Sequence, residues 1–300
     1  IADPNQIVIG AGTQQLTSHL CRILRKMNIG LVSTEDPGYL PVQNIFRDHG
    51  FSLTKIPVAA DGIVIEKLPA NIPSAVYVSP SNQFPTGSVM PIGKRYRLLE
   101  WARENRSFVL EDDYDSELRY FGKPVPALQG LDKSSRVVYL SSFSSTLFPA
   151  IKISYMVLPE EMIRIFNAIK SDYTQTCSKT EQLTLALFME DGLYYTNIRK
   201  LRNLYGQKLQ AALNAFTKYG SGHQHHIKSK NPQDAGRAFV LCKSSGAQRP
   251  VRSQSDRTGY RGSDLLLQSN PSMRGRRERK GDAAEVAGVA VHPASFPFRI

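Results

Sequence analysis

The sequence predicts an α/β fold with a mostly parallel central sheet and helices on both faces. Throughout the first 160 residues, short apolar runs typical of buried strands alternate with runs whose apolar residues recur at helical spacing. Such alternation favours parallel strands joined by crossover helices. With 300 residues, of which 41% are hydrophobic, the chain is long enough for one large domain or two smaller ones.

The predicted elements follow in a regular order. A strand, QIVIG (6–10), passes through the glycine turn GAGTQQ (10–15) into a helix, LTSHLCRILRKM (16–27). The alternation continues with LVSTEDPGY (31–39), VQNIFRDHG (42–50), SLTKIPV (52–58), AVYVSP (75–80), the helix KRYRLLEWAREN (94–105), and the strands FVLEDDYD (108–115), VVYLSSF (137–143) and YMVLP (155–159). Residues 181–217 then read as helical, with one apolar stripe: Leu193, Ile198, Leu201, Tyr205, Leu209, Leu213 and Phe216.

The net charge of +12 is concentrated in the last quarter of the chain. Residues 223–300 hold 14 of the 38 Lys and Arg but only 6 of the 26 Asp and Glu, and the first 222 residues carry a balance of only +4. Ser, Gly, Arg, Gln and Pro dominate this tail, and its apolar clusters FVL and LLL extend into no periodic pattern. We expect the tail to be largely disordered.

Several classes of protein are disfavoured by the composition. No window of 18 apolar residues predicts a transmembrane helix, and the start IADPNQIVIG does not resemble a signal peptide. The three cysteines, Cys21, Cys177 and Cys242, lie far apart, which predicts a reduced cytoplasmic protein with neither a disulfide framework nor a zinc site. Because the chain does not begin with Met, we expect a fragment or a processed product.

Polar loops follow the predicted strands, where parallel sheets bind ligands. The turn with Gly10, Gly12 and Thr13 lets the backbone and the free N–H groups of the next helix approach a phosphate, although a tight turn alone is the commoner meaning of such glycines. Asp112 and Tyr114 end a buried strand. The acid could cap the next helix, or it could hold a protonated ring nitrogen while the phenol reaches a nearby oxygen.

The stretch SSFSSTLFPAIKISY (141–155) carries a cluster of hydroxyls and one lysine between two strand-like runs. Ser142, Ser144, Ser145, Thr146 and Lys152 could bind a phosphate, and a solvated serine-rich loop is an equal alternative. These residues alone do not decide between the two.

The order of these segments resembles the fold type I pyridoxal-phosphate enzymes, and in particular the aminotransferase-like domain of MocR-type regulators in the GntR family. The resemblance covers 7–222. It rests on EDPGYLPVQNIF (35–46), SPSNQFPTG (79–87), LEDDYDSELRYFGKPVPALQGLD (110–132) and VVYLSSFSSTLFPAIKISYMVLP (137–159).

The resemblance implies a role for each polar residue of the loops. Asp112 would pair with the pyridine nitrogen of pyridoxal 5'-phosphate, and Tyr114 would face the ring hydroxyl. The phosphate would be bound by Gly12, Thr13, Gln14, Ser142, Ser144 and Lys152. Lys152 takes the place of a family arginine, which loses a two-pronged phosphate contact.

Ser145 occupies the position of the Schiff-base lysine of the family. A hydroxyl cannot form an imine with an aldehyde or transfer the α-proton as an amine does. The sequence therefore predicts no catalytic residue, and non-covalent, weak binding of the cofactor.

Three functions follow from the resemblance. The chain is predicted to be the effector- or cofactor-sensing domain of a MocR/GntR-type transcription regulator, and the alternatives are a pyridoxal-phosphate-dependent aminotransferase and a degenerate, inactive fragment. The implied effector is an amino acid or a vitamin B6 compound. The implied partner is a second copy in a homodimer, and DNA would be bound only through an N-terminal domain that this sequence lacks, with no membrane contact.

The predicted domains are a large cofactor-binding domain (1–192), a helix leading to a small domain (193–222) and an irregular basic tail (223–300). We expect the C-terminal small domain to be lost, and a shifted reading frame would explain the patternless tail. The tail also holds His223, His225 and His226, which could bind a metal, and RGRRERK, which could touch nucleic acid; a solvated charge run is the simpler explanation of the latter.

Overall fold

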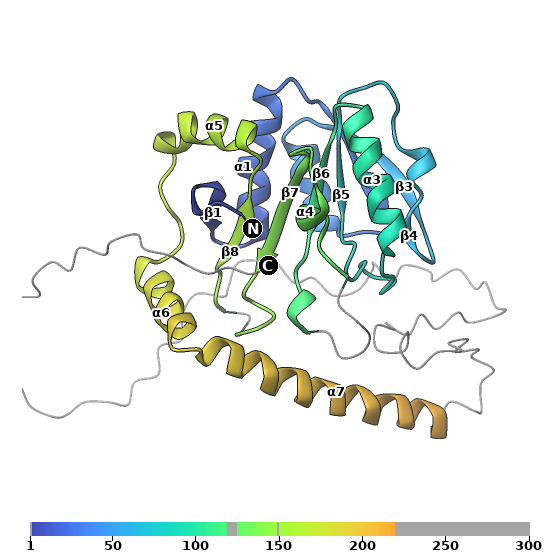
Figure 1. Ribbon diagram of the computed structural model, residues 1–300, viewed down its shortest axis with the longest axis vertical. Coiled ribbons are helices and arrows are strands. Elements are labelled where there is room, and N and C mark those ends of the chain that lie inside the picture. Colours follow the sequence, from blue (N-terminus) through green and yellow to red (C-terminus); the bar gives the residue numbers. More distant parts are fainter. Residues whose placement is uncertain (1, 119–124, 149, 220–300) are drawn as a thin grey trace, which may run out of the picture. The chain divides into compact units, whose positions relative to one another are not determined.

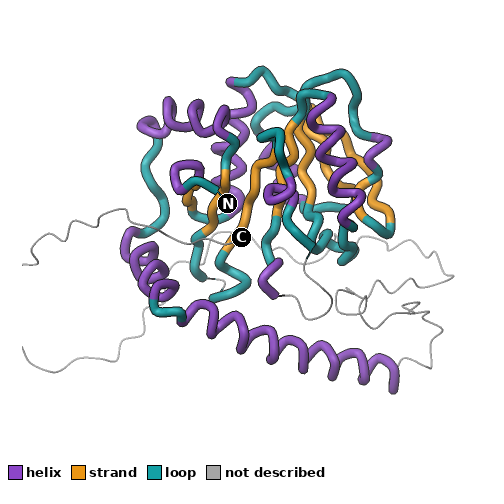
Figure 2. The backbone as a smooth tube through the Cα atoms, viewed as in Figure 1, coloured by secondary structure: helices purple, strands orange, loops and turns teal. Residues whose placement is uncertain are grey.

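The computed structural model describes residues 2–118, 125–148 and 150–219. Its centre is an eight-stranded sheet in the order β1-β8-β7-β6-β5-β2-β3-β4 (Figures 1 and 2). The strands are β1 (Ile7–Gly10), β2 (Leu31–Asp36), β3 (Ser52–Ala59), β4 (Gly62–Ile63), β5 (Ala75–Val78), β6 (Phe108–Asp112), β7 (Val137–Ser142) and β8 (Ser154–Val157). The helices are α1 (Thr13–Lys26), α2 (Leu40–Asp48), α3 (Ile92–Glu104), α4 (Leu128–Leu131), α5 (Glu160–Ile169), α6 (Lys179–Glu190) and α7 (Leu193–Tyr219).

The sheet is mostly parallel, as predicted. Strands β7, β6, β5, β2 and β3 pair in parallel, and only β8 and β4 run against their neighbours. Because β1 is antiparallel to β8 and β8 is antiparallel to β7, β1 runs in the same direction as β7. The carboxyl ends of β1, β2, β5, β6 and β7 therefore meet at one edge of the sheet.

Helices cover both faces because the central strands are apolar on both sides. In β5, Ala75 and Tyr77 pack into one core with α1, α2 and α5, whereas Val76 and Val78 pack into a second core with α3. Successive side chains of a strand point to opposite faces, so one short apolar run supplies both cores. Burial of each large apolar side chain stabilises the fold by about 1.5–3 kcal/mol.

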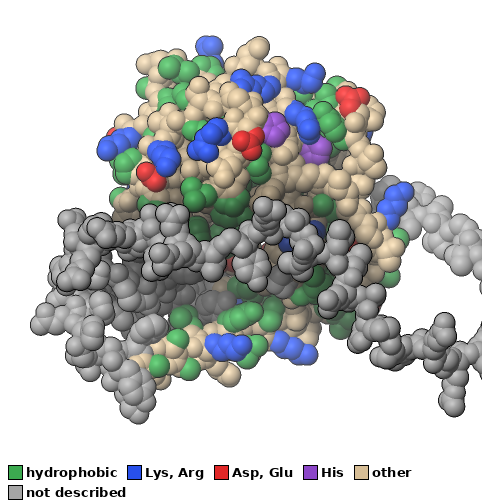
Figure 3. Space-filling view, turned by 180° about the vertical axis from the view of Figure 1, so that it is seen from behind, with side chains coloured by type: hydrophobic (Ala, Val, Ile, Leu, Met, Phe, Trp, Pro, Cys, Tyr) green, Lys and Arg blue, Asp and Glu red, His purple; other side chains and the backbone are tan. Residues whose placement is uncertain are grey.

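The last two helices pack on the loop that follows β7. Tyr194 and Ile198 of α7 are buried in a third cluster with Phe143 and Ile151. Of the predicted stripe, Ile198 is buried, whereas Leu193 is 49% and Tyr205 37% exposed. The exposed hydrophobic side chains of α7 are visible at the bottom of Figure 3. The side chain of Phe216 and the whole of the predicted tail lie outside the described residues.

Candidate functional site

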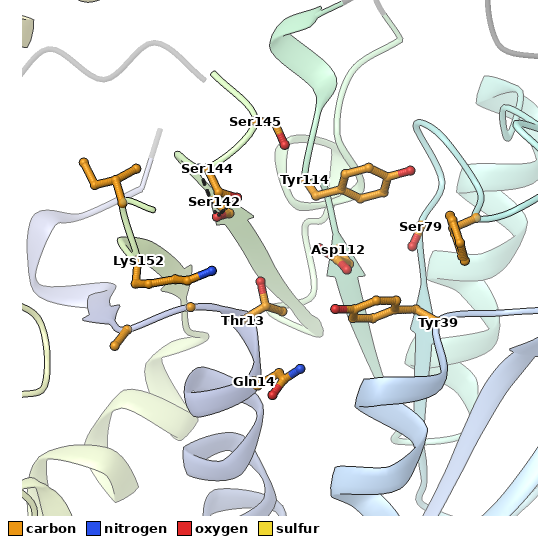
Figure 4. Close-up of a pocket in the computed structure, with 14 residues that line it drawn as sticks. Thr13, Gln14, Tyr39, Ser79, Asp112, Tyr114, Ser142, Ser144, Ser145 and Lys152 are labelled. Atoms are coloured by element: carbon orange, nitrogen blue, oxygen red, sulfur yellow. Dashed lines mark hydrogen bonds between the residues drawn. The ribbon is translucent and has the colours of Figure 1, made fainter. Parts of the chain in front are cut away.

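A cavity of about 450 Å³ opens at the carboxyl edge of the sheet. It is lined by every residue to which the family resemblance gave a cofactor-binding role, together with Ser145 (Figure 4): Gly12, Thr13, Gln14, Asp112, Tyr114, Ser142, Ser144, Ser145 and Lys152. Thr146, which the sequence offered as a further phosphate ligand, does not line it, because its buried hydroxyl donates to the carbonyl of Phe143 at 3.3 Å. Sequence reasoning missed five further lining residues: Ala11, Tyr39, Ser79, Phe84 and Ile151. Tyr39, Ser79 and Phe84 belong to the motif segments EDPGYLPVQNIF and SPSNQFPTG. Their place in these motifs is the feature of the sequence that could have identified them as lining residues.

The first wall of the cavity is the start of helix α1. Gly12 precedes the helix with φ +91°, a left-handed conformation that favours glycine. No side chain caps this helix, so the first backbone N–H groups, those of Thr13 and Gln14, have no partner within it. A helix start of this kind binds anions through these N–H groups and its positive dipole end.

The floor of the cavity is Asp112, at the end of β6. Its side chain is 6% exposed, and its Oδ2 accepts a hydrogen bond from the phenol of Tyr77. Its Oδ1 is buried and has no partner among the described residues. Burial raises the pKa of Asp112 to about 7. A buried carboxylate oxygen without a donor is costly, and a cationic ligand group would satisfy it.

The three consecutive acids of LEDDYD have different roles. Glu111 points away from the cavity, and its two oxygens accept from the N–H groups of Leu128 and Gln129 at 2.8 and 2.9 Å, where α4 begins. Oδ2 of Asp113 accepts from the phenol of Tyr139 at 2.9 Å. The capping role that we weighed for Asp112 thus belongs to Glu111, and of the three acids Asp112 alone lines the cavity.

The opposite wall is formed by the hydroxyls after β7. The Oγ atoms of Ser142 and Ser144 lie 2.9 Å apart, and the N–H of Ser144 donates to Oγ of Ser142. Figure 4 shows the amine of Lys152 pointing toward Thr13 and Ser142. Because hydroxyls, a cation and a helix start converge here, this end of the cavity is suited to a phosphate.

Ser145 lies at the Tyr114 end of the cavity in Figure 4. It is half-buried and lines the cavity. The phenol of Tyr114 donates to the backbone carbonyl of Asn82 at 3.1 Å. Burial and the neighbouring carboxylates raise the pKa of Tyr114, so the phenol is neutral and keeps its proton.

A second buried acid lies close to this site. Oε2 of Glu35 accepts from the N–H of Ser79 at 3.3 Å and from Nε2 of Gln83 at 3.2 Å, and its Oε1 has no partner among the described residues. Burial, opposed by these hydrogen bonds and reinforced by the charge of Asp112, raises the pKa of Glu35 to about 8. Glu35 thereby ties β2 to the SPSNQFPTG loop.

Neither a metal site nor a membrane-spanning helix is found among the described residues. No three His, Cys, Asp or Glu side chains among them come together as a metal site. The histidines 223, 225 and 226 lie outside these residues. Of the helices that the structure describes, none is both long enough and apolar enough to cross a bilayer.

Most of the chain is similar to known proteins. Residues 2–232 match the model of the aminotransferase class I and II family. The HTH-type transcriptional regulator YdeL of Bacillus subtilis is 45% identical over 228 residues, which are 76% of this chain and 49% of that protein. The probable rhizopine catabolism regulatory protein MocR of Rhizobium meliloti is 37% identical, over 68% of this chain and 41% of its own length. The pyridoxine biosynthesis regulator PdxR of Corynebacterium glutamicum is 32% identical, over 68% of this chain and 44% of its own length.

Solved structures of enzymes share the fold. The kynurenine aminotransferase of Pyrococcus horikoshii, determined with PMP, superposes with a TM-score of 0.64 at 28% identity, over 73% of this chain and 56% of that one. The α-aminoadipate aminotransferase LysN of Thermus thermophilus superposes with a TM-score of 0.60 at 26% identity, over 72% of this chain and 57% of that one. The chain spans about half the length of the curated relatives and of the enzymes that it matches.

Proposed function

The chain belongs to the aminotransferase class I and II family, and from this membership we propose that it is the effector-sensing, aminotransferase-like domain of a MocR/GntR-type transcription regulator. The three regulators named above support this proposal by their similarity. In it, the cavity holds pyridoxal 5'-phosphate non-covalently and weakly. The observation that carries the proposal is the free, buried Oδ1 of Asp112 in a cavity whose other end is lined with phosphate-binding groups.

The residues present fit the ring and the phosphate of this cofactor. Oδ1 of Asp112 would accept from the protonated pyridine nitrogen, since it is a buried acceptor without a donor. The start of α1 with Thr13 and Gln14, the hydroxyls of Ser142 and Ser144, and Lys152 would hold the phosphate. Tyr39 and Phe84, whose rings meet edge to face at 6.4 Å, would exclude water from the ring.

The residues do not fit the covalent part of aminotransferase chemistry. When bound, pyridoxal phosphate supplies an electrophilic aldehyde and an electron-withdrawing ring. Catalysis on it needs an amine that can bond to the aldehyde and move a proton, and Ser145 offers only a hydroxyl. In Figure 4 the amine of Lys152 points toward Thr13 and Ser142. We therefore propose a binding function and no transamination.

The proposal that the chain is part of a regulator also predicts its domains and its partners. We propose that residues 1–192 are the large domain and that 193–222 lead toward a small domain, with 223–300 as a basic tail. The effector is an amino acid or a vitamin B6 compound, the assembly is a homodimer in the cytoplasm, and DNA contact belongs to a separate N-terminal domain of the whole regulator. The similarity to transcription regulators supports these points.

Calorimetry with pyridoxal 5'-phosphate tests the proposal. We expect measurable, reversible binding, and Asp112→Ala should abolish it because it removes the carboxylate that meets the ring nitrogen. Asp61→Ala removes a carboxylate that is 55% exposed and outside the cavity, so it should leave binding intact. Absence of binding to the parent chain, or unchanged binding by Asp112→Ala, would contradict the proposal.

Covalent trapping distinguishes a regulator domain that binds the cofactor non-covalently from an aminotransferase that bonds to it. After incubation with pyridoxal 5'-phosphate and reduction with borohydride, mass spectrometry of the peptide 141–155 should show no pyridoxyl adduct. An adduct on this peptide would favour the enzyme.

A further inference from the structure

A second cavity, of about 360 Å³, lies at the opposite end of helix α1 from the first. Its lining comes from the last two turns of α1, from His49 after α2, and from the end of α5 and the residues that follow. It shares no lining residue with the first cavity. Because α1 has 14 residues, about 20 Å of helix separates the two.

Three positive charges line the second cavity: Arg22, Arg25 and Lys26. No carboxylate of the described residues forms an ion pair with any of them, and this includes Asp172, the one acid of the described lining. Figure 3 shows Lys and Arg side chains around the histidines of the described residues. The lining carries a formal balance of 3 − 1 = +2 with His49 neutral. Like charges at close range repel, so an anion with two negative charges would relieve the site.

The guanidinium of Arg25 is held in place before any ligand binds. Its central carbon lies 4.3 Å from the centroid of the Phe51 ring, and its Nη2 donates to the carbonyl of His49 at 3.0 Å. A Cβ at Gly50 would lie 3.0 Å from the same nitrogen, so the glycine leaves room for it. A stacked guanidinium keeps its remaining N–H groups in one plane, where they match the oxygens of a phosphate. Because this side chain is already ordered, binding costs less entropy.

Arg22 and its neighbours form the second wall. The guanidinium of Arg22 lies over the ring of Tyr173, 4.3 Å from its centroid, and its Nη1 is 3.4 Å from Nδ1 of His19. The Tyr173 side chain is 37% exposed, and the buried Cys21 and Ile169 add an apolar surface beside it. The second cavity thus offers cations to an anionic group and an apolar wall to an organic one.

Basic residues at the end of a helix often serve only to complement its dipole. This accounts for Arg25 and Lys26, which lie in the last turn of α1. It does not account for Arg22, which precedes that turn, or for the cavity that all three line. The dipole places about half a negative charge at this helix end, which opposes an anion, but three full positive charges outweigh it.

From these observations we infer that the second cavity binds a small phosphate monoester. The phosphate dianion meets Arg22, Arg25 and Lys26, and the organic group packs on Ile169 and Tyr173. A phosphate offers three acceptor oxygens and close to two charges to the three cations, whereas a carboxylate offers two oxygens and one charge. The cavity volume lies within the range of small-molecule sites.

Calorimetry at pH 7.5 and constant ionic strength tests this inference on the whole chain. Phenyl phosphate carries a dianion and a ring, inorganic phosphate lacks the ring, and benzoate carries the ring with one charge. All three are titrated into the Lys152→Gln variant, which removes the cation of the first cavity. We expect phenyl phosphate to bind about tenfold more tightly than inorganic phosphate, which buries no apolar group, and about tenfold more tightly than benzoate, which loses a charge-assisted hydrogen bond.

Three further substitutions in the Lys152→Gln chain locate the binding. Arg22→Gln and Lys26→Gln should each weaken phenyl phosphate about tenfold. Because Lys26 is exposed, its replacement removes a charge with little effect on packing. Arg103→Gln removes an equal charge from α3, which packs on the other face of the sheet, and should leave the affinity unchanged. The melting temperature of each variant shows whether it is folded.

Several outcomes would overturn the inference. These are no binding of phenyl phosphate, an affinity that Arg22→Gln and Lys26→Gln leave unchanged, and an equal loss in Arg103→Gln, which would report net charge and no site. Binding of a DNA duplex without binding of phenyl phosphate would also overturn it, because the cations would then form a nucleic-acid surface. None of these outcomes touches the proposed function, since the two cavities share no residue.

Discussion

The phenol of Tyr77, on β5, donates a hydrogen bond to Oδ2 of Asp112, on the neighbouring strand β6. Both side chains are buried, at 4% and 6% exposure. This bond occupies one carboxylate oxygen and leaves the other, Oδ1, for the cavity. It also favours the ionised form of Asp112, since a donor stabilises a carboxylate against the effect of burial on its pKa.

Replacement of Tyr77 by Phe should therefore weaken the binding of vitamin B6 phosphates. Without this donor the pKa of Asp112 rises, and each unit by which it exceeds the pH lowers the ionised fraction, and with it the affinity measured by calorimetry, about tenfold. The weakening should be larger at pH 6.5 than at pH 8, because the pKa of Asp112 rises further when the donor is removed. A loss that does not vary with pH would point to a merely structural role.

Tyr139→Phe is the matched control. Its phenol donates to Asp113 at 2.9 Å in the same way, but Asp113 does not line the cavity. Tyr139→Phe should lower stability to a similar degree and leave vitamer affinity within about twofold. Equal losses of affinity in both variants would mean that the loss comes from a general destabilisation of the sheet when a buried tyrosine hydroxyl is removed. Tyr77 would then not position Asp112.

Adjacent residues in the sequence were enough to indicate which loops line the cavity. Strand–helix alternation identified the parallel sheet, and its topology brought four separate polar loops to one edge. The contribution of Tyr77 could not be predicted, because its partner comes from another strand and a tyrosine in AVYV reads as an ordinary core residue. Residue types alone could not show which of three consecutive acids faces the cavity, since the direction of each depends on where β6 ends; the family resemblance was needed to single out Asp112.

The buried Glu35 should make the stability of the protein depend on pH. Its pKa is raised from 4.5 to about 8 in the folded state, mainly by burial. The folded state therefore binds a proton more tightly than the unfolded state between these values, and stability falls as pH rises through this window. From pH 6 to pH 8, this one group should lower the free energy of unfolding by about 2 kcal/mol.

Denaturant unfolding at pH 6, 7 and 8 measures this slope. Glu35→Gln should flatten it, because the amide does not titrate and its oxygen can still accept from the N–H of Ser79. Asp112→Asn should flatten the lower part of the slope, since the pKa of Asp112 is raised to about 7. If the slope in Glu35→Gln equals that of the parent chain, the carboxyl group of Glu35 is not protonated in the folded state.

Gly12→Ala should damage the phosphate end of the cavity. A Cβ at this position meets open space, but φ is +91°, which residues with a side chain rarely adopt. The strain costs roughly 1–3 kcal/mol of stability, and its relief would move the N–H groups at the start of α1 and weaken phosphate binding. Gly93→Ala, in α3, also meets open space, and there we expect a gain of up to about 1 kcal/mol with unchanged affinity. Calorimetry and thermal unfolding of both variants compare the two positions.

The pair of Arg95 and Glu111 should be the most sensitive point of the fold. Both side chains are fully buried, with Nη1 and Oε1 3.5 Å apart. The guanidinium of Arg95 also donates to the backbone carbonyls of Pro80, Met90 and Pro126, which connects α3 to the loops on either side of it. Removal of one partner from such a pair leaves a buried charge uncompensated.

Glu111→Ala should therefore destabilise the protein by about 3–5 kcal/mol in urea unfolding, because it also leaves the N–H groups of Leu128 and Gln129 without acceptors. Glu111→Gln should cost less, since its amide oxygen still accepts from one of them. The exposed pair of Glu100 and Arg103, with side chains about 60% exposed, provides the contrast, and Glu100→Ala should cost less than about 0.5 kcal/mol. A loss below about 1 kcal/mol in Glu111→Ala would show that water reaches the pair, because only hydration could then replace the missing carboxylate.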